Sequence, residues 1–333
     1  MRATMPVAMP ARPTAVSTGT KSSALRFGLA RVLEGGVLAS VVASVMFVFT
    51  RVVPGDPARV ILGDFATEAS LAALRHRLGL EGPRYVQYAH FMRHTLSLDF
   101  GESTRRPGVS ALSLAVDAAG PSAQLAACAV VFAAVLGLGA AILAVGPWLG
   151  ARARFVERAA RGIASVPLLS FAPLLTFALA LRVRVIPLPG DPEAGVVALL
   201  YPAVLLGLPM GAHLARMSIA SLSAISRMPF LLAARARGQG PLRTWLVHGV
   251  PASSAVLLTV LMAQFGALVG GAVVVERLFQ RRGLGTLVLE AYASRDLPVM
   301  EAALFLGSLL FIATQTVGRV ALVLTDPRAR SPS

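Results

Sequence analysis

The chain has 333 residues, of which 56% are apolar and only 14% are charged. Ordinary soluble domains carry about 25% charged residues, so this chain has too few polar side chains to cover a water-soluble body of its size. Its net charge of +15 would suit a nucleic-acid-binding protein, but the basic residues are scattered between apolar runs, which argues against that class and favours a protein embedded in a lipid bilayer.

Six runs without a Lys, Arg, Asp or Glu side chain divide the chain, and they cover residues 35–50, 118–151, 162–181, 194–215, 244–275 and 302–318. A helix needs about 20 mostly apolar residues to cross the hydrocarbon core. The first and last runs have 16 and 17 residues, so they reach that length only if Arg51 and Arg319 lie at the membrane interfaces. We therefore expect an all-α integral membrane protein with six transmembrane helices.

The charges between the runs predict which ends of the helices face the cytosol. One set of connecting segments carries 17 basic and 3 acidic residues, whereas the other carries 14 basic and 13 acidic residues. Positive charge is retained on the cytoplasmic side of a membrane. The more basic set comprises residues 1–34, 152–161, 216–243 and 319–333. We therefore expect both termini in the cytosol.

This topology divides the chain into five regions. A disordered cytoplasmic tail comes before the first transmembrane helix, and a large extracytoplasmic loop follows that helix. The remaining five helices form a core, which a short cytoplasmic tail follows. The regions are 1–30 for the first tail, 31–53 for the first helix, 54–117 for the external loop, 118–325 for the core with a basic loop at about 216–250, and 326–333 for the last tail.

The polar side chains at membrane depth are amides and hydroxyls rather than ionisable groups. A carrier driven by protons or sodium usually keeps an ionisable group there. Gln264 and Gln315 either line a translocation path or hydrogen-bond between helices, and the second role is the default. The chain also lacks the Gly-x-x-x-x-Gly-Lys-Ser/Thr motif of ATP-binding loops. We predict no enzymatic activity, no catalytic residue, no metal site and no cofactor bound by this chain.

The predicted external loop begins with a rigid turn and continues with two amphipathic stretches. Thr67 can cap a short helix that runs to Leu78. Three motifs occur in order along this loop, namely Pro54-Gly55-Asp56-Pro57, Gln87-Tyr88 and Asp99-x-Gly101-x-Ser103. Together they resemble the N-terminal half of the dipeptide/oligopeptide/nickel-type ABC permeases.

The basic loop carries a second motif of the same family. It reads Ala233-Ala234-Arg235-Ala236-Arg237-Gly238, and His248 follows ten residues later. It is similar to the cytoplasmic EAA loop of bacterial ABC importers. Small side chains allow a short helix to seat closely in a groove of a partner, and Gly238 permits a left-handed turn after that helix.

Further matches extend the resemblance over about residues 25–330, and departures accompany them. The stretch Glu276…Phe279…Gly283-Leu284-Gly285 resembles the family's Glu…Phe…Pro-Gly-Leu-Gly, although Arg282 replaces the proline. Residues 295–299 resemble the family's Arg-Asp-Tyr-Pro-Val. Residues 229–232 read Pro-Phe-Leu-Leu where the family usually has a polar residue. This departure predicts either weaker coupling of the loop to an ATPase or coupling to an unusual ATPase partner.

The resemblance implies a permease subunit of an ABC importer in a bacterial inner membrane. Its implied partners are a second, similar permease, two ATPase subunits that use ATP, and an extracytoplasmic solute-binding protein. The implied cargo is a peptide or a similar small solute, with nickel as an alternative. A different class, an ATP-independent secondary carrier or channel, is the alternative to the importer.

Overall fold

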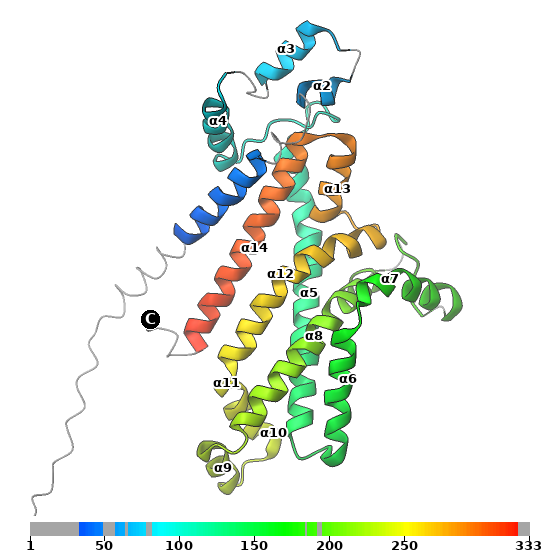
Figure 1. Cartoon of the computed structure of the whole chain (residues 1–333). Helices are drawn as coiled ribbons and strands as arrows, with labels where there is room; N and C mark the ends of the chain where they lie inside the picture. The colour runs from blue at the N-terminus through cyan, green and yellow to red at the C-terminus, as the bar shows by residue number, and fades with distance from the viewer. Residues whose placement is uncertain are drawn as a thin grey trace, which may run out of the picture.

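The computed structural model describes residues 33–48, 57–63, 66–77, 82–183, 185–191 and 195–325. The regular elements within these ranges are helices, and one isolated bridge pairs Glu102 with Ser110 (Figure 1). The all-α prediction is therefore confirmed for the described part of the chain. The predicted tails at 1–30 and 326–333 lie outside it.

The helices before the long core are short. An apolar helix at Leu33–Val48 is followed by α2 (Pro57–Leu62), α3 (Glu68–Arg77) and α4 (Arg84–Leu96). The core then comprises α5 (Ala111–Val145), α6 (Ala153–Ser165), α7 (Leu168–Phe177), α8 (Val197–Ile225), α9 (Pro229–Ala236), α10 (Pro241–Thr244), α11 (Val250–Ala252), α12 (Ser254–Leu278), α13 (Leu284–Ser294) and α14 (Leu297–Thr325). Thr67 caps α3 as the sequence predicts, because its hydroxyl oxygen accepts a hydrogen bond from the Ser70 N–H at 3.3 Å.

Three of these helices, α5, α8 and α14, are long and apolar enough to cross a membrane. Two bent helix pairs also pass this test when each pair is taken together, which gives up to five spans among the described residues. One pair joins α6 to α7 and the other joins α10–α11 to α12, with bends of 106° and 68°. The helix at Leu33–Val48 is apolar but shorter.

The bend between α6 and α7 interrupts a run that the sequence predicts as one span. Pro167 removes a backbone donor, and the preceding Val166 takes an extended conformation with φ −85° and ψ 127°. A residue before proline avoids the helical region because the proline ring crowds its backbone. The run 162–181 is therefore divided between two helices that point in different directions.

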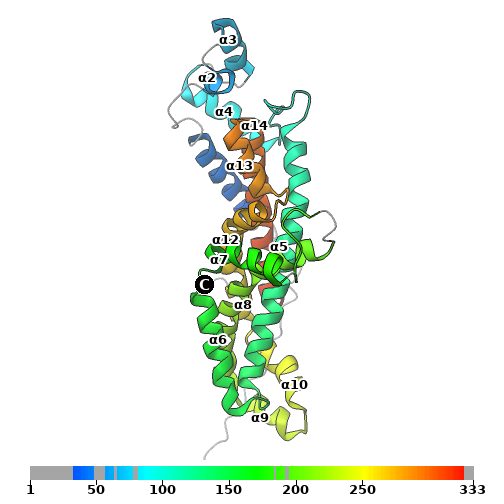
Figure 2. The same cartoon turned by 90° about the vertical axis from the view of Figure 1, so that its right-hand side faces the viewer.

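The centre of the bundle is the contact between α5 and α8, which lie side by side over much of their length (Figures 1 and 2). Small residues allow their backbones to approach closely. A methyl group added at Gly207 would lie 2.6 Å from the Ala129 carbonyl oxygen, and one added at Gly137 would lie 2.8 Å from the Gly211 carbonyl oxygen. The glycines of both helices thus set their separation.

The segment α2–α4 lies at one end of the long helices, and α9–α11 lie at the opposite end (Figure 1). The helix Leu33–Val48 packs against α14 through Ala39, Ala43 and Phe305. Tyr88 of α4 then covers this helix, since its hydroxyl oxygen lies 2.8 Å from that of Ser44. The two regions that carry the sequence motifs are thus held apart by the length of the bundle.

We predict that Gly137→Ala lowers the free energy of unfolding by about 1–3 kcal/mol, because the added methyl overlaps backbone and side-chain atoms of α8. Gly139→Ala is the matched control, since no atom lies within 4 Å of the added methyl there. Thermal unfolding of the purified protein in detergent measures both. Equal destabilisation by the two substitutions would contradict the close helix contact at Gly137.

Candidate functional site

The basic hairpin, defined here as residues 228–249, closes the end of the bundle opposite α2–α4 (Figure 1). Pro229 occupies the first turn of α9, where its missing N–H costs no helical hydrogen bond. Gly238 has a φ of +75°, and the N–H groups of Gly238 and Gln239 donate back to the carbonyls of Arg235 and Ala234 at 2.9 and 3.3 Å. This is a Schellman ending, so the left-handed turn predicted at Gly238 is confirmed.

One face of α9 is buried against the ends of α5 and α8. Leu231 and Ala234 have no exposed surface, and Leu231 belongs to a cluster that includes Leu222 and the fully buried Trp245. The Trp245 ring fits beside Gly249, where a methyl group would lie 2.4 Å from it. The helix is therefore fixed to the long helices by apolar packing.

The opposite face of α9 is exposed and mixes apolar, small and basic side chains. Phe230 is 43% exposed and Leu232 is 52% exposed. Of the six residues that the sequence predicts for coupling, Ala234 is buried, and the exposed ones are Ala233, Arg235, Ala236, Arg237 and Gly238. Such a surface can seat in an apolar groove that has an acidic rim.

Two polar contacts hold the hairpin in shape. The Arg235 guanidinium carbon lies 5.7 Å from the centre of the Trp245 ring, within the range of a cation–π interaction. A ring nitrogen of His248, Nε2, lies 3.0 Å from the side-chain oxygen of Gln239. His248 thus joins the π-helical turn Trp245–Gly249 to the segment that follows α9.

At the other end of the bundle, the predicted Asp-x-Gly-x-Ser motif attaches the segment α2–α4 to the core. The Asp296 carboxylate, at the start of α14, accepts hydrogen bonds from the Ser103 hydroxyl and, at 3.1 Å, from the Thr104 N–H. Gly101 has a φ of +75°, and its carbonyl accepts a hydrogen bond from the first N–H of α5 at Ala111. Asp99 accepts from the Gly101 N–H at 3.2 Å and so shapes the same turn.

The other external motifs lie further from the core. Gln87 is buried in α4, where its amide nitrogen donates to the Gly82 carbonyl at 3.0 Å, while Tyr88 contacts the helix Leu33–Val48. Pro57 begins α2. The remaining predicted residues of that motif, Pro54, Gly55 and Asp56, lie outside the described residues.

The residue that joins most elements was not among the predicted site residues. Glu276, near the end of α12, is 1% exposed, and its carboxylate accepts hydrogen bonds from the Ser122 hydroxyl of α5 and, at 3.1 Å, from the Thr286 N–H of α13. Ser122 in turn accepts from the Leu284 N–H at 2.8 Å. A negative charge at a helix N-terminus is favoured by the exposed N–H groups and the helix dipole.

The glycines beside Glu276 make this arrangement possible. A methyl group at Gly283 would lie 2.1 Å from the Glu276 carboxyl carbon, and one at Gly285 would lie 2.6 Å from Val273. The signal in the sequence was an acidic residue that ends an apolar run and is followed by Gly-Leu-Gly. Only the fold reveals that the carboxylate turns inward.

The two predicted path residues behave differently in the described structure. The Gln315 amide of α14 donates to the Met262 carbonyl of α12 at 3.1 Å, which is the interhelical role that the sequence leaves as the default. Gln264 of α12 is half-buried. A role of either side chain in lining a path stays a prediction.

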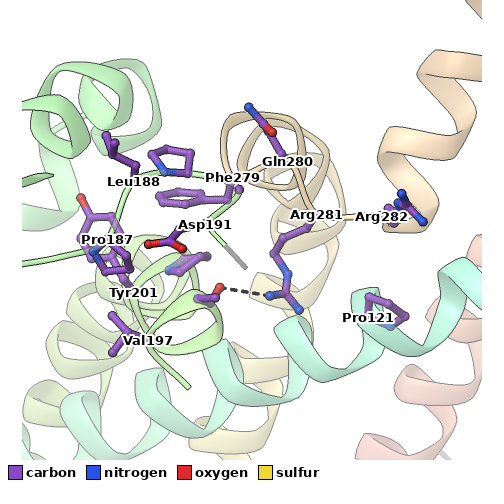
Figure 3. A pocket seen from close by; sticks show the side chains of 14 residues that line it. Pro121, Pro187, Leu188, Asp191, Val197, Tyr201, Phe279, Gln280, Arg281 and Arg282 are labelled. Atoms are coloured by element: carbon purple, nitrogen blue, oxygen red, sulfur yellow. Dashed lines mark hydrogen bonds between the residues drawn. The ribbon is translucent and has the colours of Figure 1, made fainter. Parts of the chain in front are cut away.

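Two of the concave spaces between the described helices concern the functional site. The larger, of 660 Å³, is an apolar groove between α5, α12, α13 and α14, with Glu276 among its lining residues. The smaller, of 320 Å³, lies between Pro121 of α5, the first turn of α8 and the turn that follows α12 (Figure 3). Spaces of this size can take part of a solute or a side of another helix.

Comparison with known proteins identifies the family that uses these elements. Residues 133–331 match the family described as binding-protein-dependent transport system inner membrane component, and residues 24–105 match the N-terminal part described for such membrane components. A probable peptide ABC transporter permease protein of Sinorhizobium fredii is 30% identical over 312 residues, which are 91% of this chain and 98% of that protein. The glutathione transport system permease protein of Escherichia coli K12 is 32% identical over 297 residues, which are 87% and 94% of the two chains. The resemblance seen in the motifs is confirmed.

We predict that Glu276→Gln lowers the free energy of unfolding by about 1–3 kcal/mol, because the amide carries no charge and points a donor at another donor. Glu290→Gln on α13 is the matched control. Its carboxylate is 59% exposed and lies 3.7 Å from Arg277, so the control should change stability by less than about 0.5 kcal/mol. Unfolding of both variants in detergent tests this, and equal effects would rule out the internal role of Glu276.

We also predict that Asp296→Asn loosens the segment that joins α4 to α5 without unfolding the core. The substitution removes the charge that holds Ser103 and Thr104, so trypsin should cleave after Arg105 roughly tenfold faster. Asp117→Asn, at an exposed position of α5, should leave the cleavage rate unchanged. An unaltered rate in Asp296→Asn would show that this carboxylate does not secure the segment.

Proposed function

We propose that this chain, which belongs to the family of inner membrane components of binding-protein-dependent transport systems, forms with a second permease the path by which short peptides enter the cell. The chain is a membrane permease subunit of an ABC importer rather than an ATPase. Peptides are the proposed cargo because the similar permeases carry peptide and glutathione transport in their names, and glutathione is itself a short peptide.

The proposed topology has six transmembrane helices, both termini in the cytosol and the segment 54–117 outside a bacterial inner membrane. It requires each bent helix pair to act as one span and the helix Leu33–Val48 to be the first span. The separation of α2–α4 from α9–α11 along the bundle supports this orientation (Figure 1). The excess of basic residues in the segments assigned to the cytosol supports it independently.

The proposed partner of the basic hairpin is an ATPase subunit. The observation that carries this proposal is the two-sided character of α9, which anchors Leu231 and Ala234 in the bundle and leaves Phe230 and Leu232 exposed. A helix that is fixed to the bundle on one face and apolar on the other can bind a partner there. When the partner moves, the helix transmits that displacement to α5 and α8. Two ATPase subunits, one for each permease, would bind and hydrolyse the ATP.

A second permease is proposed to cover the apolar groove of 660 Å³. Its α5 wall is formed largely by small residues such as Ala123, Ala126 and Ala127, which allow another helix to approach closely. The external segment, together with the corner between α13 and α14, is proposed to receive the solute-binding protein. ATP binding would then draw the two α9 helices together and turn the two permeases against each other, so that the path opens outward.

The test of this function is the interaction of α9 with the ATPase. Leu232→Asp places a charge on the exposed face of α9, so we expect the amount of ATPase that co-purifies with the permease to fall at least roughly tenfold while membrane insertion is unchanged. Tyr85→Asp is the matched control, because Tyr85 is 75% exposed on α4 at the opposite end. Loss of the ATPase in the control, or its retention in Leu232→Asp, would refute the assignment.

A further inference from the structure

The smaller cavity combines an aromatic wall with a basic side chain, and it lies where the proposed topology puts the outer ends of α8 and α12. Phe279 and Tyr201 form the wall, with ring centres 5.4 Å apart and the rings nearly perpendicular. Its volume of 320 Å³ is near the lower limit for small-molecule sites, which suits one end of a peptide rather than an extended chain. Figure 3 shows Arg281 on the side of this cavity that faces α5 and α8.

The backbone around Arg281 is fixed by the ending of α12. The Arg281 N–H donates to the Glu276 carbonyl at 2.8 Å, and the Gln280 N–H donates to the Arg277 carbonyl at 3.3 Å. Gln280 takes a φ of +52°, so this is a Schellman ending with a non-glycine residue in the left-handed position. Glu276 is itself held by α5 and α13. The backbone of Arg281, which is hydrogen-bonded to Glu276, is therefore fixed in place.

The Arg281 side chain has an unused donor inside the protein. One terminal nitrogen, Nη1, donates to the Ala198 carbonyl at 3.0 Å, which is the bond drawn in Figure 3. Its Nε–H is buried and finds no acceptor among the described residues. A guanidinium is always charged and presents its donors in a planar fork that fits a carboxylate. A buried donor without an acceptor is rare enough to require an explanation.

The first turn of α8 strengthens the case for an anion. Val197 and Ala198 both line the cavity, and α8 has no side-chain cap. The first N–H groups of a helix have no partner within it, and with the helix dipole they favour negative charge. The Arg281 guanidinium and the N-terminus of α8 thus line adjacent walls of the cavity, and both favour a negative charge in it.

The remaining charged groups of the cavity agree with a peptide ligand. Asp191 lies on the wall opposite Arg281 in Figure 3 and has an interaction of its own, while the Arg282 side chain is exposed and points away from Arg281. A solute that carries a carboxylate at one end and a positive group elsewhere meets both signs of charge here. An apolar side chain next to that carboxylate would contact Phe279 and Tyr201.

We infer that this cavity binds the carboxylate of the transported solute, with the Arg281 guanidinium as its anion-binding group. This inference rests on the proposed function, because it takes a peptide as the solute. A carboxylate held here would pair with the Arg281 guanidinium, which lines the cavity, and the aromatic wall would exclude water from the pair. The site selects solutes with a free carboxylate as they pass from the binding protein into the path.

The experiment uses the complete complex, with both permeases and the ATPases, in nanodiscs and in proteoliposomes. The probes are trialanine and trialanine amide, which differ only in the terminal carboxylate. Binding is measured without the binding protein, and uptake is measured at a saturating concentration of it. We expect Arg281→Gln to weaken trialanine binding roughly 10- to 100-fold and to slow its uptake similarly, while both values for the amide stay unchanged.

Arg277→Gln is the matched control, because it makes the same change in charge one turn earlier on the exposed side of α12. This control should leave both the binding and the uptake of trialanine and of trialanine amide unchanged. Arg281→Lys keeps the charge without the fork and should restore only part of the trialanine binding. These variants separate recognition of the carboxylate from a general loss of positive charge.

Each remaining outcome decides between the two proposals. If Arg281→Gln lowered the values for trialanine and its amide equally, or lowered neither, the carboxylate site would be wrong while peptide transport stood. If the unaltered complex bound trialanine through Arg281 but transported no peptide, the peptide function would be wrong while the site stood. If it neither bound nor transported trialanine, both would be wrong.

Discussion

The buried carboxylate of Glu276 is the contact on which the half of the bundle next to α2–α4 depends. It joins α5 through Ser122 and the start of α13 through the Thr286 N–H, while its own backbone carbonyl accepts the hydrogen bond that ends α12. A charge is expensive to bury unless hydrogen bonds replace the water that it loses. Here the donors come from two other helices, so the carboxylate can be satisfied only when all three are in place.

The consequences of this contact extend along the chain in both directions. The direction of α13 sets the corner before α14, where Asp296 binds the Ser103 hydroxyl and the Thr104 N–H. The segment α2–α4 is therefore attached, through α13, to the same carboxylate. The ending of α12 also sets the place of Arg281, so one buried carboxylate orders both the attachment of Ser103 and Thr104 and the proposed carboxylate site.

The sequence predicts structural features that depend on neighbouring residues in the chain. It does not predict features that depend on tertiary contacts. The left-handed turn at Gly238 was predictable because glycine alone takes a positive φ without strain. The helices α4, α12 and α13 also end with a residue in the left-handed conformation. These residues are Leu98, Gln280 and Arg295, so the sequence has no glycine there that would predict the turn. Tertiary contacts impose those endings, and a non-glycine residue in this conformation is uncommon.

The same limit applies to the spans and to the site. Apolar runs predicted α5, α8 and α14, since hydrophobic length is a property of the sequence alone. That Pro167 divides the run 162–181 between two helices was not predictable, because prolines elsewhere, such as Pro202 and Pro209 in α8, remain inside a helix. Whether a proline bends or ends a helix depends on which neighbours satisfy the freed carbonyl, and this is decided in the folded bundle.

A transport cycle driven from one end of the molecule needs a stiff connection to the other end. Small residues keep α5 and α8 in close contact, and the tightly packed cluster around Trp245 attaches α9 to both. Close-packed interiors deform little, so a force on α9 moves these helices as a unit rather than bending them locally. The 35-residue α5 then carries the motion to Ser122 and hence to Glu276. In this arrangement the carboxylate lies where a displacement of α5 is passed to α13 and to the segment α2–α4. The proposed force on α9 can therefore alter the opposite end of the bundle without any ionisable group moving across the membrane.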